Sequence, residues 1–173
     1  MGFTLKVSGG KKAAQHISRL SSVPPLEVVA GYPADLPPHP GALHRVIQED
    51  GSTSLEIEGA GASIPTIAAK NEFGDGGLVP ERAFMRPAFN ANRGDYRRRV
   101  VRIVRGVIRQ DGADPQDLAA DLGAKMESDI KAQIDATTSP ANTEFTIWKK
   151  LDADHPLIDS GTMRDSTTFR VRL

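Results

Sequence analysis

The chain has 173 residues, a length that fits one compact domain and excludes a large multidomain protein. Hydrophobic residues make up 39% of the chain, and together with the 16 glycines they match the composition of soluble globular domains, which excludes a wholly disordered chain. The 22 Lys and Arg residues balance the 22 Asp and Glu residues, so no global field attracts nucleic acid or an anionic membrane, and any such contact must be local.

The first part of the chain is predicted to contain two strands and one helix. Residues 3–7 alternate between apolar and polar side chains, as a half-buried strand does. Residues 11–22 carry an apolar stripe at helical spacing, and residues 26–32 are rich in β-formers, so we expect a helix followed by a second strand. No apolar run has the length of a signal peptide or a membrane span, so we expect a soluble protein that stays where it is made.

The next segment is predicted to form an arm. Residues 33–41 contain four prolines and so lack too many amide donors for a helix or strand. Residues 43–48 and 53–58 then flank Glu49-Asp50-Gly51-Ser52, in which Asp-Gly supplies the positive φ of a hairpin turn. Because the flanking segments are rich in proline on one side and in glycine and alanine on the other, we expect a β-hairpin that projects from the body.

Three helices and a final strand are predicted in the rest of the chain. Residues 63–74 open with serine and proline and end with glycine, as a short helix does. Apolar residues recur at helical spacing over residues 84–109 and again after the capping pair at 114–115, which predicts two long helices. Residues 168–173 alternate as a strand. This order indicates an α+β fold, with a small mixed or antiparallel sheet packed against two long helices and a projecting β-hairpin arm.

The histidines and their acidic neighbours do not have the spacing of a known metal site. The histidines are His16, His39, His44 and His155. None stands at the spacing of a metal-binding pair, and His16 is interpreted as a surface residue. The acids nearest to His155 are Asp152, Asp154 and Asp159. They lack the glycine and glutamate of an EF-hand loop and are interpreted as turn-formers and caps.

A nucleophilic site also lacks support. Ser160 lies near His155 and Asp159, but no glycine-flanked nucleophile elbow is present. Asp159 or Ser160 is interpreted instead as the N-cap of a short helix at residues 162–166. No nucleotide-binding or H-E-x-x-H motif occurs, and no cysteine is present. We therefore expect no enzyme and no cofactor; a small metal-dependent hydrolase that uses His155 and its acidic neighbours is the alternative from another class.

Charge is concentrated in the two long predicted helices. Residues 93–109 carry seven arginines and one acid, whereas residues 111–135 carry seven acids and two lysines. Two helices of opposite charge are suited to lie side by side, within one subunit or between neighbours. The arginines that share one helix face are Arg98, Arg102, Arg105 and Arg109. This face is either a solvated surface or a contact for an acidic partner or phosphate, and any contact with DNA would be non-specific.

Three short motifs stand in order in the chain. They are I-A-A-K-N-E-F-G at residues 67–74, V-P-E-R-A-F-M-R-P-A at residues 79–88, and P-L-I-D-S-G at residues 156–161. Together they resemble the A-x-x-N-E-F-G, P-x-R-P-F-L-R-P-A and P-L-I-D-T-G motifs of the neck or tail-completion proteins of long-tailed bacteriophages. The chain departs from that pattern at Ala83, where the family usually has proline, and at Ser160, where it usually has threonine.

The resemblance implies a single neck or tail-completion domain over residues 1–173, in which residues 33–62 form an extended loop and hairpin excursion that is long for the family. It implies a structural virion protein at the head–tail junction, assembled in the host bacterial cytoplasm as a homo-oligomeric ring, commonly of six copies. The implied partners are phage head-closure or connector proteins on one side and tail terminator or tail tube proteins on the other. Genomic DNA in the channel would be touched non-specifically, with no membrane contact. A tail terminator that caps the tail tube is the nearest alternative.

The motif residues have structural roles in this interpretation. Glu72 beside Arg82 or Arg86 would form a carboxylate–guanidinium clamp. Phe73 and Phe84 would anchor the loop to the core. The motif residues are Asn71, Glu72, Phe73, Gly74, Pro80, Arg82, Phe84, Arg86, Pro87, Pro156, Leu157, Asp159, Ser160 and Gly161.

Overall fold

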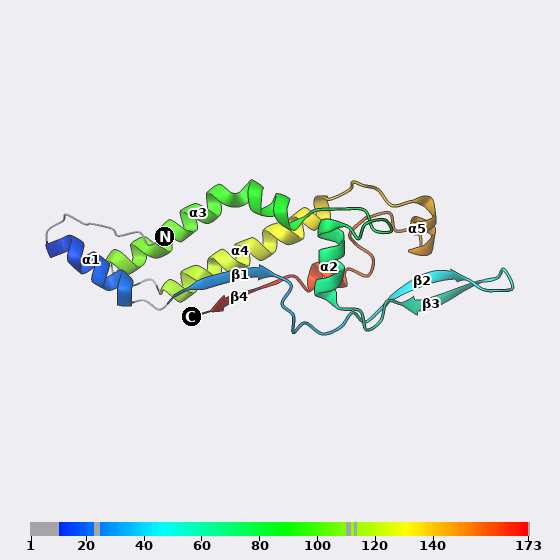
Figure 1. The fold of residues 1–173 in the computed structure, drawn as a ribbon, viewed down its shortest axis with the longest axis horizontal. Helices are drawn as coiled ribbons and strands as arrows, with labels where there is room; N and C mark the ends of the chain where they lie inside the picture. Colours follow the sequence, from blue (N-terminus) through cyan, green and yellow to red (C-terminus); the bar gives the residue numbers. More distant parts are fainter. Residues whose placement is uncertain (1–10, 23–24, 110–111, 113, 173) are drawn as a thin grey trace.

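The computed structural model describes residues 11–22, 25–109, 112 and 114–172. The protein is 49% helix and 14% strand, which confirms the predicted α+β class with two long helices. Figure 1 shows an elongated molecule with a β-hairpin at one end and a helix at the other. The strand expected at residues 3–7 lies outside the described residues, as does Leu173 at the end of the final strand.

The elements in chain order are α1 (Lys11–Ser22), β1 (Glu27–Gly31), β2 (Ala42–Ile47), β3 (Thr53–Glu58), α2 (Ile64–Phe73), α3 (Met85–Arg109), α4 (Pro115–Ala136), α5 (Glu144–Lys149), α6 (Thr162–Asp165) and β4 (Thr168–Arg172). The helices and strands expected within the described residues are thus confirmed, and α5 is an addition to them. The expected cap of the last short helix is wrong: Gly161, in the left-handed conformation with φ 82°, occupies the N-cap position of α6 in place of Asp159 or Ser160.

Local signals account for the start of α4 and the end of α2. The Asp114 side chain accepts a hydrogen bond from the Gln116 amide, and Pro115 is the first residue of α4. Gly74 ends α2 with φ 73°, a conformation that favours glycine. These three positions are the ones that the sequence pattern marks as helix ends.

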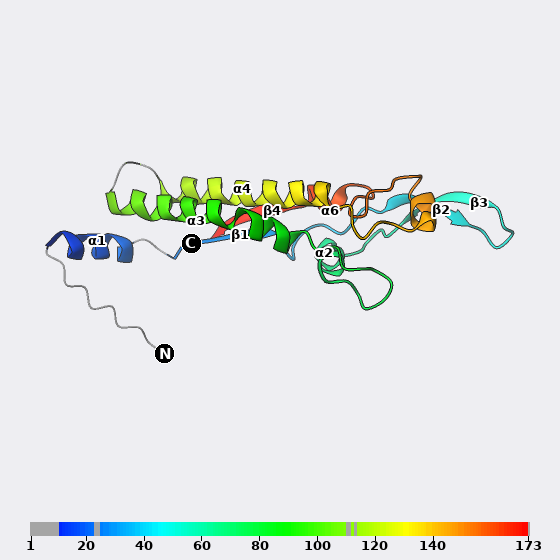
Figure 2. The same ribbon diagram turned by 90° about the horizontal axis from the view of Figure 1, so that it is seen from above.

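The strands form two separate antiparallel pairs. β1 pairs with β4, with Glu27 opposite Arg172 and Gly31 opposite Thr168. α4 lies on one face of this sheet and α3 packs against α4 (Figure 2). β2 pairs with β3 in a hairpin that extends beyond the body, as the projecting-arm prediction requires.

Gly123 on α4 lies directly against Phe169 of the sheet. A Cβ at this position would lie 2.2 Å from Cδ2 of the Phe169 ring on β4. The absence of a side chain at Gly123 therefore lets α4 approach the sheet, and the Phe169 ring fills the space.

Replacing Gly123 by alanine is expected to lower the free energy of unfolding by about 1–3 kcal/mol, because the new methyl group overlaps the Phe169 ring. The matched control is Gly94→Ala in α3, where the nearest atom to a new Cβ is the flexible Arg98 side chain at 3.8 Å. There the loss of glycine should raise stability by up to about 1 kcal/mol. Urea unfolding of both variants is the measurement, and equal effects would contradict the close packing.

Candidate interaction surfaces

Glu72 at the end of α2 binds the N-terminus of α3. Its buried carboxylate accepts hydrogen bonds from the backbone amides of Phe84 (2.7 Å), Met85 (2.9 Å) and Arg86 (3.1 Å). The Nε of Arg86 donates a further bond at 2.8 Å. Burial by itself would raise the pKa of Glu72, but these bonds outweigh it and hold the pKa below the ordinary value. The carboxylate is therefore charged at neutral pH and satisfies amides that a helix start leaves unpaired.

Arg82 does not take part in this clamp. It is buried and holds the loop after α4, since its Nε donates to the Pro140 carbonyl at 2.7 Å and its Nη2 to Oδ1 of Asn142 at 3.2 Å. The amide of Asn142 donates in turn to the His155 carbonyl at 3.2 Å. Arg82 therefore links the second motif to the segment that leads into the third.

The two aromatic residues of the motifs have different environments. Phe84 is 0% exposed and lies in the core, as expected. Phe73 is 66% exposed, so the prediction that it anchors the loop to the core is wrong. The Arg86 guanidinium lies 5.1 Å from the centre of its ring, a cation–π contact made possible because Glu72 holds the arginine in place.

The three motif segments meet in one core. The core cluster comprises Ala68, Phe84, Ala88, Ile130, Ile134, Leu157 and Met163. Ala68 belongs to the first motif segment, Phe84 and Ala88 to the second, and Leu157 to the third. The Asn71 amide lies 3.8 Å from the sulfur of Met163, just after the third motif. Pro80 is exposed, and Pro87 and Pro156 are half-buried. The motifs therefore build one joint between α2, α3 and the C-terminal segment.

Two histidines meet the third motif in a cavity of about 310 Å³. His44 has Nδ1 3.0 Å from Glu58 and Nε2 2.8 Å from Asp159. His39 has Nε2 3.2 Å from the Ser160 hydroxyl, while its Nδ1 accepts from the Gly41 amide at 2.9 Å. Because Nδ1 is an acceptor, a neutral His39 carries its proton on Nε2 and is placed to donate to Ser160 rather than to deprotonate it.

The grouping of Ser160, His155 and Asp159 does not form. Nδ1 of His155 accepts from the Leu157 amide at 3.3 Å, and Nε2 lies 3.1 Å from the Asp135 carbonyl. Asp152 pairs with Arg45 and Asp159 with His44. Among the described residues, no group of three or more His, Asp or Glu side chains is arranged to hold a metal ion.

The arginine face lies on the exposed side of α3. With Arg97 and Val101 it lines a groove of about 500 Å³. Its members are Arg98, Arg102, Arg105 and Arg109. Arg98 pairs with Asp95 of the same helix at 3.1 Å, and in the part of the chain that the structure describes no carboxylate pairs with the other three.

Helices α3 and α4 lie side by side, but charge contributes little to their contact. Arg99 pairs with Asp121 and forms the one ion pair between the two helices among the described residues. The Tyr96 hydroxyl donates to Asp129 at 2.8 Å. Acids further along α4 pair elsewhere, as Asp135 does with Arg164. The arginine face is thus left for a partner outside this chain or for solvent.

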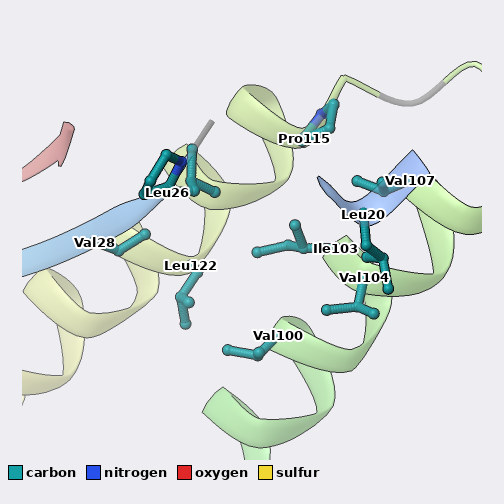
Figure 3. Close-up of a pocket in the computed structure, with 10 residues that line it drawn as sticks. Leu20, Leu26, Val28, Val100, Ile103, Val104, Val107, Pro115 and Leu122 are labelled. Carbon is teal, nitrogen blue, oxygen red and sulfur yellow. The ribbon is translucent and has the colours of Figure 1, made fainter. Parts of the chain in front are cut away.

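An apolar groove of about 460 Å³ lies at the end of the molecule opposite the hairpin (Figure 3). Side chains from α1, α3, α4 and the β1 region point into it. Its lining residues are Leu20, Pro25, Leu26, Val28, Val100, Ile103, Val104, Val107, Pro115 and Leu122. The sequence did not reveal this groove, because its walls come from two distant stretches of the chain, residues 20–28 and 100–122.

Among the described residues, the contacts that tie the hairpin to the body lie in its inner half. Besides His44 with Asp159, Arg45 binds both carboxylate oxygens of Asp152 at 2.8 Å. Glu58 pairs with Lys149 of α5 at 2.7 Å. The outer half of the hairpin, including the turn, extends past these contacts (Figure 1).

Comparison of the chain with protein-family models, curated proteins and solved structures found no match in any of the three. Within the described residues, no helix has both the length and the apolar composition needed to cross a membrane.

Proposed function

We propose that this protein is a structural, non-catalytic component of a phage virion that assembles as a ring at the joint between head and tail. The observation that carries the proposal is the convergence of the three motif segments on one joint, through Glu72 with Arg86 and through the shared core around Phe84. Residues that resemble a family's motifs and also build one packed unit support a common fold.

The surfaces of the chain support a role in assembly. An apolar groove and a projecting hairpin lie at opposite ends of an elongated body, and the arginine face of α3 is exposed. Of the residues considered for catalysis, His155 is engaged with backbone groups, Asp159 with His44 and Asp152 with Arg45. This arrangement favours a protein that binds other proteins over a hydrolase.

The experiment is electron microscopy with antibody labelling. Negative-stain images of the purified protein are expected to show rings or ring-forming oligomers, and antibodies against the protein should label the head–tail joint of virions. Label at the tail tube end of tails that lack heads would favour the tail terminator alternative. A stable monomer that binds a divalent metal and is absent from virions would overturn the proposal.

The triple variant Arg98→Gln, Arg102→Gln and Arg105→Gln tests what the arginine face contacts. We expect loss of head–tail joining, because a fixed contact between subunits that loses one partner of a desolvated ion pair is weakened by about 3–5 kcal/mol. The control is Arg170→Gln with Arg172→Gln, two exposed arginines of β4. Particles that join normally but lose or retain DNA abnormally would show that the face lines the channel instead.

A further inference from the structure

One face of the hairpin carries four exposed apolar side chains around Arg45, which turns toward the body and binds Asp152 and the Trp148 carbonyl. The register places Leu43 opposite Ile57 and Arg45 opposite Leu55, so these side chains and Ile47 lie on the same face. Leu43, Ile47, Leu55 and Ile57 are 47%, 58%, 58% and 69% exposed. Four large apolar side chains on one face of a projecting hairpin form a surface that water solvates poorly.

The apolar groove at the opposite end is complementary in character. Val100 and Val104 on α3 form a rim that is 46% and 40% exposed, and the deeper lining is also aliphatic. On the other side of this rim, α3 carries Val101 and then the arginine face. The groove and the arginines therefore form one continuous surface on α3.

The charges of the two surfaces are also complementary. The turn of the hairpin carries Glu49 and Asp50, and residues 47–57 contain no Lys or Arg. Glu56 lies on the face opposite the four apolar side chains, where the Gln48 amide donates to it. Hydrogen bonds from the Ser52 hydroxyl and amide hold the pKa of Asp50 below its ordinary value, so its carboxylate is charged. On α3, Arg102, Arg105 and Arg109 have no carboxylate partner among the described residues. A partner with apolar side chains and acids at one tip matches this surface in both respects.

We propose that the β2–β3 hairpin of one copy of this chain docks in the apolar groove of a second copy, with its acidic turn against the arginine face of α3. The contact joins two different surfaces at opposite ends of an elongated molecule, so it repeats from copy to copy and yields a closed ring or an open chain rather than a two-fold dimer. The inference deepens the proposed function, on which it rests, by naming the contact between subunits.

Two variants test the proposal: one disrupts the apolar face of the hairpin, and the other disrupts the groove. The hairpin variant is Leu55→Asp with Ile57→Asp, and the groove variant is Val100→Asp with Val104→Asp. All four side chains are exposed enough that the fold should survive, which circular dichroism checks. By light scattering after size exclusion, the wild type should form oligomers, and each variant should run as a monomer of 18.6 kDa. The control Leu78→Asp, at a residue 93% exposed and in neither surface, should behave as the wild type does.

Mixing the two variants is the decisive step. In the mixture, the groove variant supplies an intact hairpin and the hairpin variant supplies an intact groove. Pairs of twice 18.6 kDa should therefore form, and nothing larger. A wild type that stays monomeric at high concentration, or a mixture that forms no pairs, would overturn the inference. Antibody label at the head–tail joint, found together with either result, would leave the proposed function intact. Failure of the docking inference is therefore distinguishable from failure of the proposed function.

Cysteine cross-linking identifies the occupant of the groove, since the chain has no cysteine of its own. Separate Ile57→Cys and Val104→Cys proteins should form a mixed disulfide dimer on oxidation, whereas Leu78→Cys should not pair with Val104→Cys. An intrachain disulfide in the double variant Leu5→Cys and Val104→Cys, without the mixed dimer, would assign the groove to the chain's own N-terminal segment and overturn the inference.

Discussion

Replacing Glu72 by alanine is expected to lower the free energy of unfolding by about 3–5 kcal/mol, since three backbone amides lose their acceptor. The substitution removes the buried acceptor for the amides of Phe84 and Met85 and for the Arg86 side chain, which is itself 51% exposed. Unpaired amides at a buried helix start cost stability because water cannot replace the lost acceptor. Denaturant unfolding followed by circular dichroism is the measurement.

The control for this variant is Glu81→Ala. Glu81 binds the same arginine, at 2.6 Å from Nη2 of Arg86, but its side chain is 56% exposed. An exposed pair of this kind contributes about 0–1 kcal/mol. If both variants lost equal stability, the arginine alone and not the buried carboxylate would hold the joint.

The effect of Glu72 should depend on pH in a defined direction. Its pKa in the folded protein lies below the ordinary value of 4.5. A carboxylate with a lowered folded-state pKa stabilises the protein fully above the unfolded-state pKa and loses that contribution as pH falls through the folded-state pKa. The stability difference between wild type and Glu72→Ala should therefore be constant near neutral pH and shrink below pH 4.5. A difference that grew on acidification would contradict this assignment.

Deleting residues 42–59 is expected to leave a folded protein that no longer assembles. The base of the hairpin is already closed, since the His39 amide donates to the Ala62 carbonyl at 2.8 Å and the Gly61 amide to the His39 carbonyl at 2.9 Å. A Cβ on Gly41 would lie 3.3 Å from that of Ala60, so the new ends can be joined without moving the body. The hairpin is tied to the body by ion pairs whose partner side chains on the body are 38%, 69% and 35% exposed. Exposed pairs of this kind contribute about 0–1 kcal/mol each, so the body should fold without them.

The measurements for this deletion are cooperative thermal unfolding, which should persist, and incorporation into virions, which should be lost. The variant that keeps the hairpin but carries Leu55→Asp and Ile57→Asp separates loss of the apolar face from loss of the chain segment, and it should show the same assembly defect. Entry of the deletion variant into virions at the wild-type level would show that the hairpin is not an assembly arm.

Local features of the chain were predictable because their causes lie within a few residues. Asp114 and Pro115 start α4, Asp50-Gly51 turns the hairpin, and Gly74 ends α2, each through its own backbone preference. The amphipathic spacing likewise predicts α3 and the one-sided arginine face. The assembly role inferred from the three motifs stays a prediction.

Contacts between distant residues required the tertiary structure. The sequence left Arg82 and Arg86 both open as partners of Glu72. Only the tertiary structure selects Arg86 and buries Arg82 against the loop after α4. The same packing leaves Phe73 exposed and brings His44 to Asp159, 115 residues away. The apolar groove arises in this way too, because its walls are supplied by four elements whose relative placement depends on the whole core rather than on local propensity.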